Sequence, residues 1–244
     1  MITKRVALTT AAIAATLLLG LTACAGEQGS KQTDPPGDSK ETPTEPSTDP
    51  TGAWIDNGRA IALVSWGSSS TACTPMVEEV KVDGQTVNVE LQDPQVNAVC
   101  TRDFVPRASY IALPDGVDVS KDVKVVFSGA DMSGDFTLTG SSDLAKAAND
   151  AGAPLDGGPS AGWFATDGIV LLTYGSSSCP PIVSDIIERA DGATVEFKTD
   201  DTRACTADLA PRLTILGLGE PVKSPKNYTL KLSGDHLDGE VVVR

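Results

Sequence analysis

The chain reads Gly-Ser-Ser-Ser over residues 67–70, followed by Cys73, and it reads Gly-Ser-Ser-Ser-Cys over residues 175–179. Each serine motif is followed downstream by a second motif. It reads Cys-Thr-Arg-Asp-Phe-Val-Pro-Arg over 100–107 and Cys-Thr-Ala-Asp-Leu-Ala-Pro-Arg over 205–212. The copies are offset by 108 residues at the glycines and by 105 at the second cysteines. Changes of offset that fall in turn-like stretches are typical of insertions into loops. The sequence therefore predicts two copies of one module.

Both copies read as short strands. Residues 59–66 and 168–174 are near-continuous apolar runs, typical of a central strand covered on both faces. Residues 76–82 turn at Asp-Gly into the alternating run 86–91, which is a hairpin signal. About six short strands per copy and almost no helix predict an all-β fold of two tandem antiparallel sandwiches, immunoglobulin-like or otherwise, or barrels. The remaining strands are predicted at 109–113, 123–127 and 136–138, and at 194–198, 213–218, 228–232 and 241–243.

Cysteines stabilise the modules in this interpretation. Four remain once Cys24 is set aside, and four cysteines permit three pairings. Because each copy contains two, the repeat favours Cys73–Cys100 and Cys179–Cys205. A redox pair or a metal site is the alternative, but no Cys-x-x-Cys occurs and no histidine lies near these cysteines in the sequence. No cofactor and no metal ion is expected.

The serine loops are the candidate functional stretches. Their serines could form a tight turn that delivers the cysteine to its bond, cradle a ligand on backbone amides, or supply a nucleophile. A nucleophile needs a base, and the single histidine, His236, aligns with Asp131 in the first copy. We therefore expect a turn, with ligand binding second and catalysis last. The candidate binding residues, including an aromatic beside each loop, are Trp66, Ser68, Ser69, Ser70, Tyr174, Ser176, Ser177 and Ser178.

The second motif, Cys-Thr-x-Asp-x-x-Pro-Arg, has a similar pair of interpretations. Its Thr and Asp side chains can bond nearby backbone amides and shape a turn. Asp103 with Arg107, and Asp208 with Arg212, could pair or face a ligand, and a local scaffold is the preferred interpretation. One tryptophan opens each module, Trp54 and Trp163, and we expect each to cover a core rather than stack on a ligand.

The first residues have the pattern of a secretory signal. Lys4 and Arg5 precede an apolar stretch that is too short to span a bilayer well, and Leu-Thr-Ala-Cys ends at Cys24. This ending resembles the lipobox of bacterial lipoproteins, in which the signal is cut before a cysteine that carries a lipid. The resemblance implies lipid attachment at Cys24 and a place on the extracytoplasmic face of the cell membrane. An ordinary secretory signal with an incidental cysteine is the alternative.

Charge and composition restrict the partners. Loss of Lys4 and Arg5 with the leader lowers the formal net charge from -14 to about -16. A surface this acidic repels phosphate backbones and anionic headgroups, so nucleic acid is not expected as a partner. Residues 25–52 contain no Val, Ile, Leu or aromatic residue, and five prolines, which is typical of a solvated tether.

Between the modules, Ser141-Ser142 predicts the cap of a short helix over 143–148, followed by a Gly- and Pro-rich stretch. We expect some freedom between the modules there. The predicted boundaries are 1–23 for the signal peptide, 24–52 for the lipidated cysteine and tether, 53–139 for the first module, 140–161 for the linker and 162–244 for the second module.

The paired motifs also resemble modules of actinobacterial lipoproteins, over both repeats. The first copy departs from that pattern, since Thr71 and Ala72 separate serine from cysteine and Thr74 replaces a proline. The resemblance implies a lipid-anchored envelope protein but no substrate. The sequence thus predicts a non-enzymatic, extracytoplasmic protein that presents two disulfide-stapled modules to an envelope protein, a glycan or a small ligand. A serine-loop hydrolase or protease-inhibitor-like protein is the alternative, and a passive spacer is a third.

Overall fold

The computed structural model describes residues 47–94, 97–151, 158–223 and 225–244. The predicted signal peptide, Cys24 and most of the predicted tether lie outside the described residues, as does part of the predicted linker. From Pro46 to Arg244 the chain forms one compact unit.

Among its described residues, module 1 has seven strands in two sheets. The inner sheet has the order β1-β2-β5 and is antiparallel throughout. The outer sheet has the order β3-β4-β6-β7, in which β4 and β6 are parallel and the other neighbours are antiparallel. The strands are β1 Thr51–Ile55, β2 Ala60–Gly67, β3 Met76–Asp83, β4 Thr86–Gln92, β5 Val105–Ala112, β6 Val123–Gly129 and β7 Met132–Leu138.

Module 2 repeats this topology strand for strand. Its inner sheet has the order β12-β9-β8, and its outer sheet has the order β10-β11-β13-β14 with β11 and β13 parallel. The predicted all-β fold of two sandwich modules is therefore confirmed, and the four sheets are open rather than closed into barrels. The prediction of antiparallel sheets was wrong for the outer sheets, because β4 with β6 and β11 with β13 run parallel. The strands are β8 Ser160–Ala165, β9 Gly168–Gly175, β10 Val183–Arg189, β11 Gly192–Phe197, β12 Ala210–Gly217, β13 Thr229–Ser233 and β14 Gly239–Val242.

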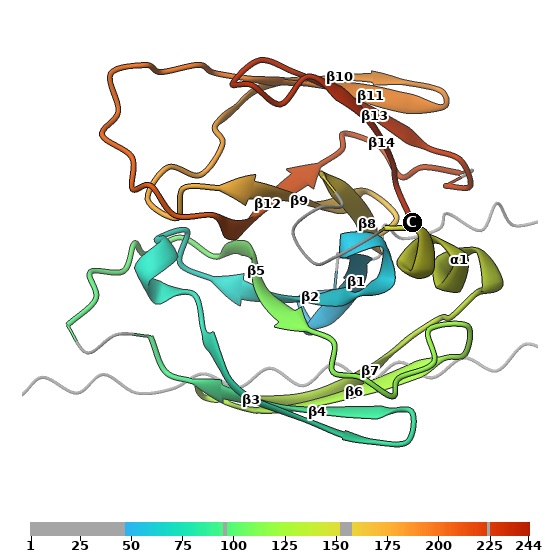
Figure 1. Ribbon diagram of the computed structural model, residues 1–244. Coiled ribbons are helices and arrows are strands. Elements are labelled where there is room, and N and C mark those ends of the chain that lie inside the picture. Colours follow the sequence, from blue (N-terminus) through green and yellow to red (C-terminus); the bar gives the residue numbers. More distant parts are fainter. Residues whose placement is uncertain (1–46, 95–96, 152–157, 224) are drawn as a thin grey trace, which may run out of the picture. The chain divides into compact units, whose positions relative to one another are not determined.

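The four sheets stack in four layers, with the inner sheets in the middle (Figure 1). Three hydrophobic cores fill the three spaces between the layers: one inside each module and one between the modules. The core between the modules contradicts the expected freedom across the linker. Both inner sheets are apolar on both faces, so each module buries its second face against the other.

Strand β2 explains why the apolar runs are continuous. Ile61 and Leu63 point into the core of module 1, while Ala62 and Val64 point into the core between the modules. All four side chains are almost completely buried. Strand β9 alternates in the same way, so the predicted covering of both faces is correct.

The inner sheets approach closely where β1 faces β8. The Asp56 amide donates to the Ser160 hydroxyl at 2.6 Å, and Gly162 lies against the Trp54 backbone. Higher numbers on one strand therefore meet lower numbers on the other, which means that β1 and β8 run in opposite directions. Small residues permit this approach, because the buried face of module 1 includes Ala53, Ala60 and Ala62.

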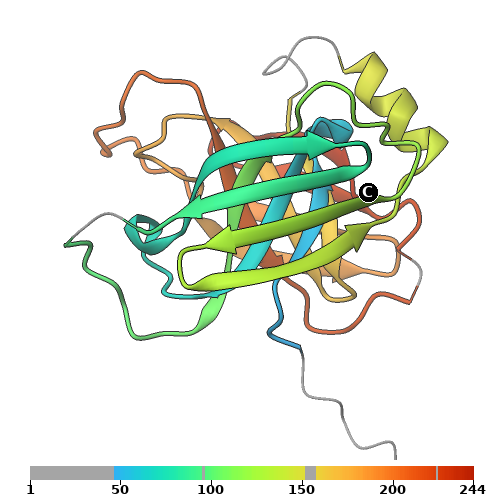
Figure 2. The ribbon, with the colours of Figure 1, turned by 90° about the horizontal axis from the view of Figure 1, so that it is seen from below.

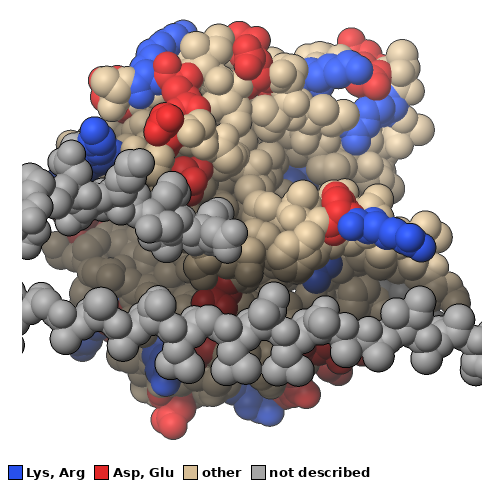
Figure 3. Space-filling model, turned by 180° about the vertical axis from the view of Figure 1, so that it is seen from behind, with Lys and Arg blue, Asp and Glu red and all other residues tan. Residues whose placement is uncertain are grey.

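The main errors of prediction are the first strands, β1 and β8, which make seven strands per module instead of six. The predicted helix is present as α1, Ser142–Asp150, and the Ser141 hydroxyl accepts a hydrogen bond from the Leu144 amide at 3.1 Å. The helix lies beside the sheets of module 1 (Figure 2). Over the face seen in Figure 3, acidic and basic side chains are interspersed.

Candidate functional site

The serine loop of module 1 is held by hydrogen bonds to the second motif. The Ser68 hydroxyl lies 2.8 Å from the Thr101 hydroxyl and accepts from the Thr101 amide at 2.9 Å. It also accepts from the Ser70 amide at 3.1 Å. Ser68 is nearly buried. Its oxygen is therefore engaged inside the loop, which is the arrangement of a structural turn.

Asp103 completes this network. Its carboxylate accepts from the Ser69 amide at 3.0 Å and from the Thr101 hydroxyl. Hydrogen bonds from the Ser69 side chain, then from Thr101, lower the pKa of Asp103 to about 2. The carboxylate thus remains charged at neutral pH and serves as the acceptor that orders the loop.

Module 2 builds the same network with a different serine. Here the Ser178 hydroxyl accepts from the Thr206 amide at 3.0 Å, and the Ser176 hydroxyl lies 2.8 Å from the Thr206 hydroxyl. The Ser177 amide donates to Asp208 at 3.2 Å. Hydrogen bonds from Thr206 and then Ser177 lower the pKa of Asp208 to about 2.

The motif arginines reach the first cysteine of each module rather than the motif aspartates. Arg107 donates to the Cys73 carbonyl, and Arg212 donates to the Cys179 carbonyl at 3.0 Å. Each guanidinium lies against a glycine: a β-carbon on Gly67 or Gly175 would lie 2.6 Å from the guanidinium carbon. Neither of the Asp–Arg ion pairs that the sequence allowed forms among the described residues. The scaffold interpretation of this motif is thereby favoured.

Both predicted disulfides are present. The Cα atoms of Cys73 and Cys100 are 5.8 Å apart, and those of Cys179 and Cys205 are 5.6 Å apart. Each bond ties the end of the serine loop to the start of the second motif. Each module therefore contains one braced pair of loops. The groups that join the two loops are glycine, serine, threonine, aspartate, arginine and the cystine.

The aromatic residues beside the loops pack between the modules. Trp66 meets Phe164 edge to face, with ring centroids 6.4 Å apart. Tyr174 borders the same intermodular core, and its hydroxyl lies in the surroundings of Tyr110 and Asp56. Burial, followed by these neighbours, raises the pKa of Tyr174 far above its usual value. Trp66 and Tyr174 are therefore adjacent to the serine loops in sequence, but their rings pack against the core between the modules.

The opening tryptophans belong to cores, as predicted. Trp54 is 7% exposed, and its indole nitrogen donates to the Thr139 carbonyl at 2.8 Å. Trp163 packs against Tyr228 with ring centroids 5.1 Å apart.

Exposed apolar side chains flank both cystines, and sequence reasoning did not single them out. Phe104 is 66% exposed and its counterpart Leu209 is 58% exposed. Met76 and its counterpart Ile182 are 45% and 43% exposed. Both of these equivalent positions are apolar in each copy, although the residues differ. We call them the cystine-flanking apolar residues; the repeat alignment itself could have revealed them.

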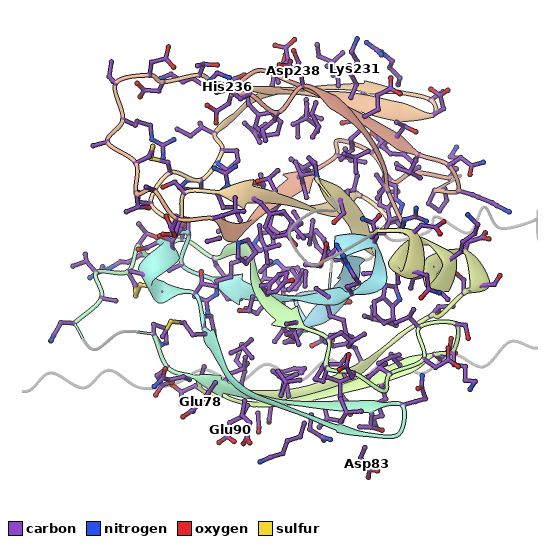
Figure 4. All side chains as sticks on the ribbon, viewed as in Figure 1. Glu78, Asp83, Glu90, Lys231, His236 and Asp238 are labelled. Carbon is purple, nitrogen blue, oxygen red and sulfur yellow. A yellow bond between two sulfur atoms is a disulfide. The ribbon has the colours of Figure 1, made fainter. Side chains whose placement is uncertain are left out.

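Ser176 and His236 border one hollow of about 270 Å³ in module 2, together with Arg203 and Arg212. His236 lies on the turn before β14, near Asp238, and Glu78 and Glu90 project from the opposite outer sheet (Figure 4). The Ser176 hydroxyl bonds the hydroxyls of Ser178 and Thr206. The position in module 1 that aligns with the histidine is an aspartate, so any Ser–His chemistry would belong to module 2 alone.

A buried ion pair was missed by sequence reasoning. Arg59 and Asp56 lie 2.6 Å apart, and their side chains are 16% and 2% exposed. Asp-Asn-Gly before Arg59 is a turn sequence, and Asp56 and Asn57 have φ of 49° and 56°. The unusual turn was the available signal, but burial of its charges is not visible in a sequence.

The fold and these loops define an all-β protein of two fused, cystine-braced modules. No protein-family model matches the sequence, and no curated protein or solved structure matches it. Within the described ranges, no cluster of three or more His, Cys, Asp or Glu could hold a metal ion. Among the helices of those ranges, none has the length and apolar character needed to cross a membrane.

Replacing Ser68 by alanine is expected to lower the free energy of unfolding by about 1–2 kcal/mol, because two backbone amides lose their acceptor. Ser70→Ala is the matched control: Ser70 takes part in the turn through its backbone amide and carbonyl, so the change should stay within about 0.5 kcal/mol. Urea unfolding of residues 46–244 measures both. Equal effects would contradict a structural role of the Ser68 hydroxyl.

The loop of module 1 should loosen in acid. The folded pKa of Asp103 is about 2, below an unfolded value of about 3.9, so its stabilising effect is complete above about pH 4 and is lost as the pH falls toward 2. The Ser69 amide resonance should report this titration. In Asp103→Asn the same resonance should not move between pH 4 and 2; an unchanged titration would assign the effect to another group.

Proposed function

We propose that the chain is a lipid-anchored, extracytoplasmic protein that binds an envelope partner through its cystine-braced loops, without catalysis. The supporting observation is the network itself: in both modules serine hydroxyls are hydrogen-bonded to threonine, and a serine backbone amide donates to aspartate. Such loops are rigid supports for what lies beside them. Beside them, in both copies, lie the exposed cystine-flanking apolar residues.

The apolar residues carry the binding role. An exposed Phe or Leu at the edge of a rigid loop loses little side-chain entropy on binding and can fill a partner's pocket. Because the modules share a core, the two loop pairs are held at a fixed separation. A partner that engages both pairs gains from the second contact without a new ordering cost.

The test places a photo-crosslinking amino acid at position 104 or 209 of the protein expressed in its own host. Both positions should give a cross-linked product with the same partner. The control positions are 187 and 242, where Ile187 and Val242 are 43% and 49% exposed on the outer sheet of module 2. A product of equal yield from the controls, or none from 104 and 209, would contradict the proposal.

Lipid attachment is tested separately. Cys24→Ser should abolish incorporation of labelled fatty acid and release the protein from the membrane fraction, while the Phe104 cross-link survives in reduced yield. Incorporation that persists without Cys24 would argue for an ordinary secretory signal.

A hydrolase centred on module 2 is the second candidate, favoured by the shared hollow of Ser176 and His236. It predicts that turnover of simple esters disappears equally in Ser176→Ala and His236→Ala. Turnover lost in only one of the two would exclude a Ser–His pair.

A further inference from the structure

Module 1 contains a hollow of about 470 Å³ whose lining includes no residue of the cystine-braced loops. It lies between the turn of the Asp56–Arg59 pair, the segment 112–119 and helix α1. Hollows of 300–1,000 Å³ are typical of sites for small molecules. It is independent of the cystine-braced loops.

The floor of the hollow is polar and fixed. Asp56 and Arg59 form the buried ion pair described above, and Tyr110 lies next to it. The backbone at Asp56 and Asn57 is in the left-handed region, as it is in the turns at Ala130–Asp131 and Asp235–His236, and Asp and Asn adopt it more readily than most residues. The turn is held in place because the Asp56 amide is also bonded to Ser160 of module 2.

The walls are apolar and the rim is acidic. The rim carries Asp115 and Asp118, and Arg59 is the one basic residue among the described residues of the lining. Asp118 is paired with Lys121, whose side chain is 69% exposed and does not line the hollow. Because Asp56 is paired with Arg59 and Asp118 with Lys121, the carboxylate of the lining that has no ion-pair partner among the described residues is that of Asp115. The apolar walls are formed by Ala112, Leu113, Val117, Val119, Ala145 and Ala148.

We infer that this hollow binds a small amphipathic organic cation, an amine on a compact hydrocarbon frame. The hydrocarbon would lie on the apolar walls, and the ammonium would meet the Asp115 carboxylate or the Tyr110 ring, which attracts cations through its π face. An anion would have to pass the rim carboxylates and lie near the Asp56 charge. The net charge of -14 raises the local concentration of cations further.

The probes are cyclohexylamine, cyclohexanol and cyclohexanecarboxylate, which share one ring and differ in charge. They are titrated at millimolar concentration into isotopically labelled residues 46–244, the compact unit that contains all three cores. The amine should shift amide resonances of segment 112–119 and α1, with an affinity at least about tenfold above that of the alcohol. The carboxylate should bind more weakly still. Equal affinity for amine and carboxylate, or no shift in these segments, would overturn the inference.

Variants locate the site. Ala148→Phe fills the hollow and should remove amine binding, whereas Ala147→Phe places the same ring on the same helix at a position outside the lining. Asp115→Asn, an exposed change, should weaken the amine several-fold and leave the alcohol unchanged. Amine binding that is the same in Ala148→Phe and Ala147→Phe would overturn the assignment, and so would an Asp115→Asn variant that weakens both probes equally.

Discussion

Replacing Gly162 by alanine should lower the free energy of unfolding by about 3 kcal/mol, because the added methyl group meets backbone on the facing sheet. The new β-carbon would lie 1.9 Å from the Trp54 carbonyl oxygen. Backbone atoms cannot rotate away as a side chain can, so the two inner sheets would have to separate. Separation opens the core between the modules, and overpacking a close-packed interior is costly.

Gly217→Ala is the matched control. Gly217 also lies in a strand of an inner sheet, but a β-carbon added there would meet no atom within 4 Å beyond its chain neighbours, so its effect should stay within about 0.5 kcal/mol. Urea unfolding followed by tryptophan fluorescence compares the two variants. Similar midpoints would mean that the sheets do not meet at Gly162.

The second large effect is expected from the disulfides. Changing Cys73 and Cys100 together to serine removes a bond that closes 27 residues, which is worth about 3.5 kcal/mol in the chain-entropy account. The corresponding double change in module 2 removes a bond across 26 residues and should cost nearly the same. Each is measured by urea unfolding against the unchanged protein.

The shared core adds a qualitative expectation to this experiment. Because the modules bury one another's inner faces, either double variant should still unfold in a single transition, at lower urea, by fluorescence and by circular dichroism alike. Two separate transitions would show that the modules unfold independently and would contradict the importance of the interface.

Much of the fold was predictable because the spacing of apolar residues and the positions of turn-forming residues indicate the same strands. The continuous apolar run of β2 indicated a strand covered on both faces, and alternation marked β4 and β6. Strand β1 was missed because Thr-Gly-Ala-Trp-Ile is short, includes residues of weak β-propensity and follows a proline-rich segment. The sequence also could not reveal what covers the second face of β2, because a pattern of burial does not name the covering surface.

The candidate site was likewise predictable in part. The cysteine pairing and the turn-forming role of Thr and Asp could be predicted, because the repeat and side-chain chemistry are local information. The reach of Arg107 to the Cys73 carbonyl could not, since it depends on how two loops meet in space. The same is true of the Asp56–Arg59 pair, whose spacing is ordinary and whose aspartate has its backbone amide bonded to Ser160 of the second module.

The opposed directions of β1 and β8 bear on how the protein can be divided. The inner face of module 1 is formed by Ala53, Ile55, Ala60, Ala62 and Val64, all almost inaccessible to solvent in the intact chain. A gene cut at the linker would yield two half-proteins, each with its apolar inner face exposed to water. Such halves would dimerise or precipitate. Studies of the truncated protein would therefore measure self-association rather than the contribution of either half.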